Sequence, residues 1–181
     1  MLTAALLACA VGIAPATMDA VVAVESGRRE LALHINAWAG PQPHLASSMA
    51  EASATARRFM ATGHSVDIGL GQLNSAHLSS MRMSVEDAFD PCRNLAASGM
   101  VLSGFYAAAV QRWGEGQVAL AHALSGYNSG DILSRGFLNG YVGKYYINVG
   151  LTPTTGKKPR PEPDIREVSY DRPGYEMKDM Q

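Results

Sequence analysis

Apolar residues recur at helical spacing along most of the chain, and they do so most regularly between residues 91 and 114. The apolar positions of that segment are Leu95, Leu102, Phe105, Ala109 and Trp113. Asp90 is a favourable N-cap, Pro91 suits the first position of a helix, and Gly114 suits its end. The pattern therefore predicts a long amphipathic helix over this segment.

Four shorter segments carry similar helix signals. They are residues 17–25, 48–63, 117–124 and 141–149. Thr17 is the expected N-cap of the first and Gly27 its stop, while Ser48 and Glu51 form a predicted capping box at the second. No segment alternates apolar and polar residues with period two for long enough to predict a large sheet. We therefore expect an all-α or mostly α fold.

Composition divides the chain into three parts. Residues 1–15 are apolar but shorter than the roughly 20 residues of a membrane span. They are either the remnant of an export leader without its positive start or a first helix that ends at Pro15. Residues 16–150 form the expected folded domain. Residues 151–181 hold five of the nine prolines and few large apolar side chains, which predicts a disordered or partner-dependent tail.

Charge and residue spacing argue against two classes of function. The net charge is −1 and basic residues form no stripe, which argues against binding to nucleic acid. The five histidines show no HxxxH or HExxH spacing, and Cys9 and Cys92 form no CxxC pair, so we expect no metal site. The two cysteines can be free thiols or one disulfide, and their spacing alone leaves both open.

Glu25 is a carboxylate at the end of the first predicted helix, directly after the apolar residues 21–24. The negative end of the helix dipole and the loss of solvent beside valines both favour the neutral acid and raise its pKa. A general acid that works near neutral pH needs such a pKa. The alternative is a solvated glutamate at a fraying helix end, paired with Arg28 or Arg29.

Two glycine-rich segments carry side chains that suit sugar recognition. In GLGQLNS, the glycines allow close approach of a ligand to the backbone, and Gln72 and Asn74 offer amide donors and acceptors. In GYNSG, Tyr127 and Asn128 are expected on a loop after a helix. Ordinary glycine-rich turns are the alternative for both segments.

These motifs occur in an order that resembles a known family. VAVESG, VDIGLGQLNSAHL and ALSGYNSGD follow one another within residues 9–150, as the Glu-Ser, Gly-Leu-x-Gln and Tyr-Asn segments do in lytic transglycosylases of the lysozyme-like superfamily. AFDPCRNLAASG adds the Phe-Asp-Pro-Cys-x-Asn-Leu run that is distinctive of the transglycosylase component of type IV secretion and conjugation systems. The resemblance implies a lysozyme-like transglycosylase domain that opens peptidoglycan locally for such an apparatus.

By this resemblance, Glu25 is the single catalytic acid and then base, and Cys9 and Cys92 form a disulfide. The implied substrate-binding residues are Ser26, Gln72, Asn74, Tyr127, Asn128 and Tyr141. The implied reaction cleaves the bond between N-acetylmuramic acid (MurNAc) and N-acetylglucosamine (GlcNAc), leaves a 1,6-anhydro ring, and needs no metal or cofactor. The implied protein is a periplasmic monomer that binds glycan strands, and its tail is expected to bind secretion or conjugation components. A hydrolytic lysozyme of the same fold and a non-catalytic glycan-binding assembly factor are the alternatives.

The motifs depart from the family pattern at two places. Arg28 and Arg29 stand where an aromatic residue or Asn-Pro often follows the Glu-Ser pair. Gly71 stands where methionine is usual, which is expected to remove a side chain from the cleft. Asp67 lies inside the second motif, but the sequence gives no reason to place it across the scissile bond from Glu25.

Overall fold

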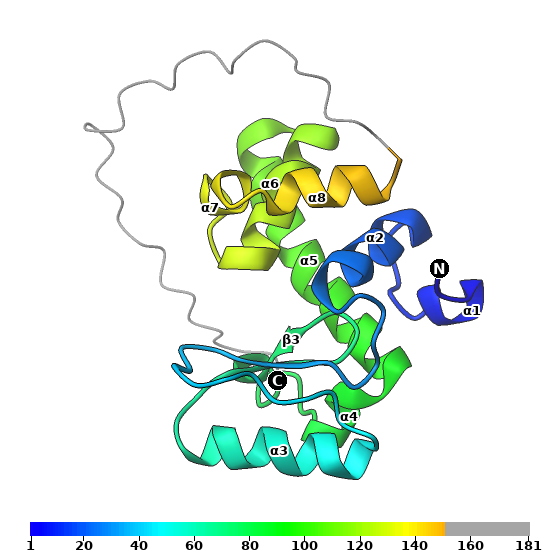
Figure 1. Cartoon of the computed structure of the whole chain (residues 1–181). Coiled ribbons are helices and arrows are strands. Elements are labelled where there is room, and N and C mark those ends of the chain that lie inside the picture. The colour runs from blue at the N-terminus through cyan, green and yellow to red at the C-terminus, as the bar shows by residue number, and fades with distance from the viewer. Residues whose placement is uncertain (151–181) are drawn as a thin grey trace, which may run out of the picture.

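Helices dominate the fold of residues 1–150, which are the residues that the computed structural model describes (Figure 1). The helices are α1 (Ala4–Leu7), α2 (Pro15–Glu25), α3 (Met49–Ala61), the 3-10 helix η1 (Ser75–His77), α4 (Val85–Phe89), α5 (Pro91–Trp113), α6 (Gln117–Ser129), α7 (Arg135–Leu138) and α8 (Tyr141–Asn148). The strands are β1 (Leu33–Ile35), β2 (Val66–Ile68) and β3 (Leu73–Asn74). The mostly α prediction is confirmed, and the predicted tail over residues 151–181 lies outside the described residues.

The long helix α5 passes through the middle of the molecule, with α6 and α8 on one side and α3 and α4 on the other (Figure 1). Leu95 and Leu102 of α5 are fully buried in a core shared with α1, α2, α6 and α8. Ala97 joins a second core between α3, α4 and the strands. One helix therefore fixes a helical half of the molecule against a half that contains the sheet. No helix of residues 1–150 combines the length and the hydropathy needed to cross a membrane.

The bounds of α5 agree with the prediction, and Asp90 accepts a hydrogen bond from the Arg93 amide as its N-cap. Thr17 is not the N-cap of α2, so that prediction is wrong. The helix begins at Pro15, whose ring already fixes a helical φ, and the Thr17 hydroxyl instead accepts a hydrogen bond from Tyr145 at 3.2 Å.

The capping box at α3 is only half correct. Ser48 accepts a hydrogen bond from the Glu51 amide, as predicted. The Glu51 carboxylate, however, binds the amide and hydroxyl of Ser47 and not the amide of Ser48. The first turn of α3 is therefore capped by two successive serines.

Helix α6 continues past Leu124 to Ser129 and ends at Gly130, which has the left-handed conformation that suits a helix end. Tyr127 and Asn128 were expected on a loop, and the structure places both in the last turn of this helix. A helix holds its side chains at fixed angles, so the two residues point where the packing of α6 on α5 directs them.

A small antiparallel sheet with the order β1-β2-β3 was not predicted. Its strands have three residues or fewer, which is too short for a recognisable period-two pattern. His34 lies opposite Asp67, and Asp67 lies opposite Asn74. Directly opposite residues share one face of a sheet, so these three side chains form a row.

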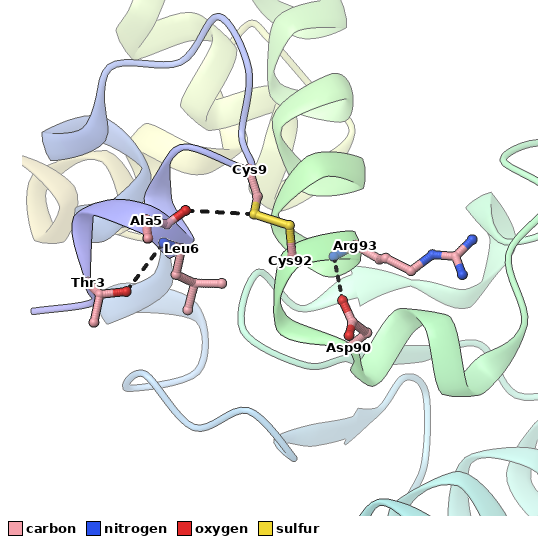
Figure 2. Close-up of a disulfide and its surroundings, with 7 residues drawn as sticks. All are labelled: Thr3, Ala5, Leu6, Cys9, Asp90, Cys92 and Arg93. Carbon is pink, nitrogen blue, oxygen red and sulfur yellow. Dashed lines mark hydrogen bonds between the residues drawn. A yellow bond between two sulfur atoms is a disulfide. The ribbon is translucent and has the colours of Figure 1, made fainter.

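A disulfide between Cys9 and Cys92 joins the segment after α1 to the first turn of α5 (Figure 2). The Cα atoms lie 5.3 Å apart, within the usual range for a disulfide. The pairing that the resemblance implied is confirmed. Residues 1–15 contain α1, and Leu7 and Ala10 are buried in the first core.

We expect the Cys9→Ser/Cys92→Ser variant to lose about 4 kcal/mol of unfolding free energy, because the bond closes a loop across 83 residues. Urea unfolding followed by circular dichroism measures the change. Wild-type protein treated with a reductant should unfold at the same urea concentration as the variant. A variant as stable as the oxidised protein would contradict this prediction.

Candidate active site

Glu25 is the last residue of α2, and the chain turns sharply directly after it. Ser26 closes the helix with its amide bonded to the Val22 carbonyl. Gly27 and Arg28 then take positive φ angles of 60° and 64°, which reverse the direction of the backbone. Positive φ is strained for a residue with a side chain. The turn therefore ends α2 directly after Glu25.

Glu25 lies where two cavities meet. Each cavity has a volume of about 450 Å³ or slightly less. Residues common to both linings are Glu25, Asn36, Asp67, Gln72 and Asn128. The first cavity, which we call the Tyr127 cavity, is also lined by Phe105 of α5 and Tyr127 of α6. The second cavity, which we call the Arg29 cavity, is also lined by Arg29, His34 and His44. Together they form one cleft that extends to both sides of Glu25, as a site for a polymer requires.

Burial raises the pKa of Glu25 from its ordinary 4.5 to about 7. Tyr141 opposes this shift, since its hydroxyl donates a 2.6 Å hydrogen bond to Oε1 and so favours the charged form. The negative charge of Asp67 raises the pKa of Glu25 further. The prediction of a raised pKa from desolvation is confirmed, and the added influence of Asp67 was not foreseen.

Neither neighbouring arginine forms an ion pair with Glu25. Arg28 turns back along α2 and binds Asp19, with Nη2 at 2.8 Å and Nε at 3.3 Å from its two carboxylate oxygens. Arg29 donates from Nε to the Ser26 carbonyl at 2.9 Å. The alternative of a solvated Glu25 paired with either arginine is therefore wrong.

Asp67 is a cleft residue whose importance the sequence did not reveal. It lies on β2 between buried Val66 and Ile68, on the face opposite the core. Asn74 donates to its Oδ1 at 2.6 Å. Burial raises the pKa of Asp67, while the amides of Asn36 and Asn74 oppose that shift. The short alternation Val-Asp-Ile was the only sequence signal for this placement, and it is too brief to read alone.

Gln72 and Asn74 line the cleft, but the protein itself uses much of their hydrogen-bonding capacity. Gln72 has a positive φ of 50°. Its Nε2 donates to the carbonyls of Gly69 and Ala32 at 3.0 and 3.3 Å. Asn74 uses Nδ2 for Asp67 and Oδ1 to cap η1. Gln72 therefore keeps its amide oxygen for a ligand, whereas Asn74 chiefly fixes Asp67.

Tyr127 and Asn128 also line the cleft, from the end of α6. The Tyr127 hydroxyl donates to the Gly71 carbonyl at 2.6 Å and so joins α6 to the β2–β3 turn. Asn128 accepts a 2.6 Å hydrogen bond from Asn139. Burial raises the pKa of Tyr127 well above its usual range, so its hydroxyl stays a donor.

The structure does not bring Ser26 or Tyr141 into the lining of either cavity. Ser26 is only 1% exposed, and its hydroxyl donates to the Val22 carbonyl. Tyr141 is buried at the start of α8, behind Glu25. The expected contacts of these two residues with substrate are corrected accordingly: Ser26 closes α2, and Tyr141 contacts the Glu25 carboxylate.

Gly71 does not open the cleft as expected. A Cβ atom at this position would lie 2.2 Å from Ser98 Oγ and 3.0 Å from the Tyr127 hydroxyl. A side chain there would thus enter the packing between α5 and α6 and would not project into the cleft. Glycine is required because these groups already occupy the space.

Within residues 1–150, no group of three or more His, Cys, Asp or Glu side chains is arranged to hold a metal ion. The polar groups that line the cleft are carboxylates, amides, imidazoles, one tyrosine hydroxyl, one serine hydroxyl and one guanidinium. Among these groups, Glu25 lines both cavities and has a pKa of about 7.

Comparison with known proteins identifies relatives along most of the chain. The model of the transglycosylase SLT domain matches residues 5–135. Protein virB1 of Agrobacterium fabrum is 36% identical over 136 residues, which are 75% of this chain and 54% of that protein. Type IV secretion system protein virB1 of Brucella abortus is 36% identical over 124 residues, 68% of this chain and 51% of that protein. The chain thus spans about half the length of these curated relatives. No solved structure gives a significant match.

Two substitutions should move the pKa of Glu25 in opposite directions. Tyr141→Phe removes a hydrogen bond to the carboxylate and should raise it above about 7, while Asp67→Asn removes a like charge and should lower it. Carbon-detected NMR titration of the glutamate carboxyl groups measures both. Tyr146→Phe, on the same helix but bonded to the Gln117 carbonyl, is the control and should change nothing. Shifts of the same sign in both variants would contradict this assignment of causes.

Glu25 should also make the folded state less stable as the pH rises. Between pH 4.5 and about 7, the folded protein keeps a proton on Glu25 that the unfolded chain has released. Stability conferred by this proton is complete below pH 4.5 and is lost as the pH rises through the folded pKa. The Glu25→Gln variant has no titrating group at this position and does not lose this stability. The unfolding free energy of the variant relative to the wild type should therefore increase by about 3 kcal/mol between pH 4.5 and about 7. Urea unfolding at a series of pH values tests this, and a constant difference would contradict it.

Proposed function

The chain belongs to the transglycosylase SLT family, and we propose that it is a peptidoglycan lytic transglycosylase in which Glu25 is the single catalytic acid and base. One observation carries the proposal: a carboxyl group with a pKa of about 7 lies at the junction of the two cavities of a continuous cleft. A polymer that fills both cavities presents an internal bond to Glu25. A carboxyl group that is partly protonated near neutral pH can both give and take a proton.

In the proposed reaction, Glu25 first protonates the oxygen that links C1 of MurNAc to GlcNAc, and that bond breaks. The 6-hydroxyl of the same MurNAc then attacks C1, and Glu25 removes its proton. A 1,6-anhydro ring forms, GlcNAc leaves with a free 4-hydroxyl, and Glu25 recovers the proton that it donated. No water is consumed and no cofactor takes part.

Tyr141 and Asp67 are assigned different supporting roles. The Tyr141 hydroxyl stabilises the Glu25 carboxylate after it has given up its proton, and it holds the group in one orientation. Asp67 lies in the same cleft and carries negative charge that can stabilise positive charge developing at C1 in the oxocarbenium-like transition state. Gln72, Tyr127 and Asn128 are the proposed saccharide-binding residues, because each lines the cleft beside Glu25.

Hydrolysis is the second candidate reaction, and the position of Asp67 favours it. Glycosidases that use water place two carboxyl groups around the scissile bond, and Asp67 lines both cavities together with Glu25. In that case Asp67 would bind C1 or activate water, and the products would have reducing ends. The 1,6-anhydro outcome is preferred because the chain belongs to a transglycosylase family.

The proposed setting is the periplasm, where local opening of peptidoglycan would allow a type IV secretion or conjugation apparatus to assemble. Its support is the virB1 relatives, whose names include a type IV secretion system protein. The Cys9–Cys92 disulfide agrees with an oxidising compartment. We propose that the protein acts as a monomer, binds glycan strands and no nucleic acid, and uses residues 151–181 to contact other components.

Digestion of purified peptidoglycan tests this function, with mass spectrometry of the released muropeptides. Wild-type protein should release products that end in 1,6-anhydro-MurNAc, and Glu25→Gln should lower release by about 10³-fold because general acid and base catalysis is lost. Activity should fall as the pH rises through about 7, where Glu25 loses its proton. Products with reducing ends only would indicate the hydrolase. Equally poor release by both proteins would indicate the non-catalytic glycan-binding factor.

A further inference from the structure

The two cavities on either side of Glu25 differ in the groups that they offer to a ligand. Besides the residues shared by both cavities, the Tyr127 cavity is lined by the apolar or aromatic Leu73, Val101, Phe105 and Tyr127, by small residues, and by the uncharged side chain of Asn74 and the imidazole of His77. The Arg29 cavity has a strongly polar lining that includes Arg29, His34 and His44. Among the described residues that line either cavity, Arg29 is the only arginine or lysine. Permanent positive charge is therefore confined to one side of the cleft.

Arg29 is held at this cavity by a contact that leaves its charge available. Its Nε donates to the Ser26 carbonyl, directly after Glu25, which leaves the two terminal nitrogens of the guanidinium for other acceptors. No carboxylate of residues 1–150 forms an ion pair with Arg29. Arg28 differs sharply, because both sides of its guanidinium are taken up by Asp19. Of the two arginines that depart from the family pattern, one braces α2 and the other faces the cleft.

A second segment that lines the Arg29 cavity is also fixed in place. Pro43, His44 and Leu45 lie on the segment between β1 and α3. Gln42 anchors this segment, since its amide accepts a hydrogen bond from the Ile35 amide at 2.7 Å and donates to the Ile35 carbonyl at 2.9 Å. The Gln42 side chain thus continues the edge of β1 as another strand would. His44 is therefore held at the cavity by a clamped segment and not by a free loop.

We propose that the Arg29 cavity binds a carboxylate of the peptide that branches from a muramoyl residue of the glycan, so that Arg29 recognises the acidic stem peptide. The inference rests on the proposed function. In a peptide-bearing strand, the lactyl carboxyl group of MurNAc is consumed in the amide bond to the peptide, and the sugar rings offer hydroxyl and acetamide groups. The free carboxylates of such a strand therefore belong to the stem peptide. Two terminal guanidinium nitrogens match the two oxygens of a carboxylate, and His34 and His44 can add hydrogen bonds. Asp67 lines both cavities, and the amides of Asn74 and Asn36 compensate part of its negative charge.

Binding to uncleaved oligosaccharides tests the inference independently of catalysis. The Glu25→Gln variant is titrated by calorimetry with a muramoyl tetrasaccharide that carries acidic stem peptides, and with the same compound after amidation of its peptide carboxylates. The acidic form should bind about tenfold more tightly, the size of one charge-assisted hydrogen-bonded pair. Adding Arg29→Gln should abolish this ratio, and Arg29→Lys should retain part of it. Lys144→Gln removes the same charge from an exposed position on α8 and should retain the full ratio.

Binding of the amidated tetrasaccharide checks that the cleft is intact, because Arg29→Gln should leave that affinity unchanged. Equal affinity of the Glu25→Gln variant for the acidic and amidated forms would overturn the inference. A tenfold ratio that survives Arg29→Gln would overturn it as well. If wild-type protein released no muropeptides while this ratio followed Arg29, the proposed catalysis would fail and the peptide-binding role of Arg29 would stand.

Discussion

The hydrogen bond between Tyr141 and Glu25 joins residues that are 116 positions apart, and the candidate site depends on it. To form it, α8 must return across the molecule and pack on α2, where Tyr141, Val142 and Tyr145 enter the same core as Val21 and Val22. This packing removes water from Glu25 and supplies one strong donor in its place. The carboxyl group is therefore desolvated without being left unsatisfied.

Opposing electrostatic effects then set the protonation of Glu25. Burial and the charge of Asp67 favour the neutral acid, and Tyr141 favours the carboxylate. The balance lies near pH 7, where both forms are populated. Burial likewise raises the pKa of Asp67 above its ordinary 3.8, and the amides of Asn36 and Asn74 only oppose that shift. Burial thus raises the pKa of both carboxyl groups in the cleft, and hydrogen-bond donors oppose the shift at each of them.

The cleft requires close contact between segments that are far apart in the sequence. Tyr127 of α6 binds the Gly71 carbonyl in the β2–β3 turn, and Gly71 has no room for a side chain beside Ser98 of α5. The disulfide from Cys9 holds the start of α5 against the segment that follows α1 (Figure 2). Since α5 belongs to both cores, these ties fix the helical half against the sheet half. The separation of the cleft walls therefore depends on residues from three different motifs and on Cys9.

The sequence by itself determined the features that rest on neighbouring residues. Periodicity and caps gave α5 its bounds, and the apolar run before Glu25 predicted its raised pKa, because each signal lies within a few turns of chain. Motif order was enough to indicate the family and, through it, the Cys9–Cys92 pair. Tertiary structure alone decided that Asp67 lines the cleft with Glu25, that Tyr141 binds the Glu25 carboxylate, that Ser26 is buried and that Arg28 binds Asp19. Strands of three residues or fewer leave no readable pattern, and hydrogen bonds across more than 100 residues exist only once the two cores have packed around α5.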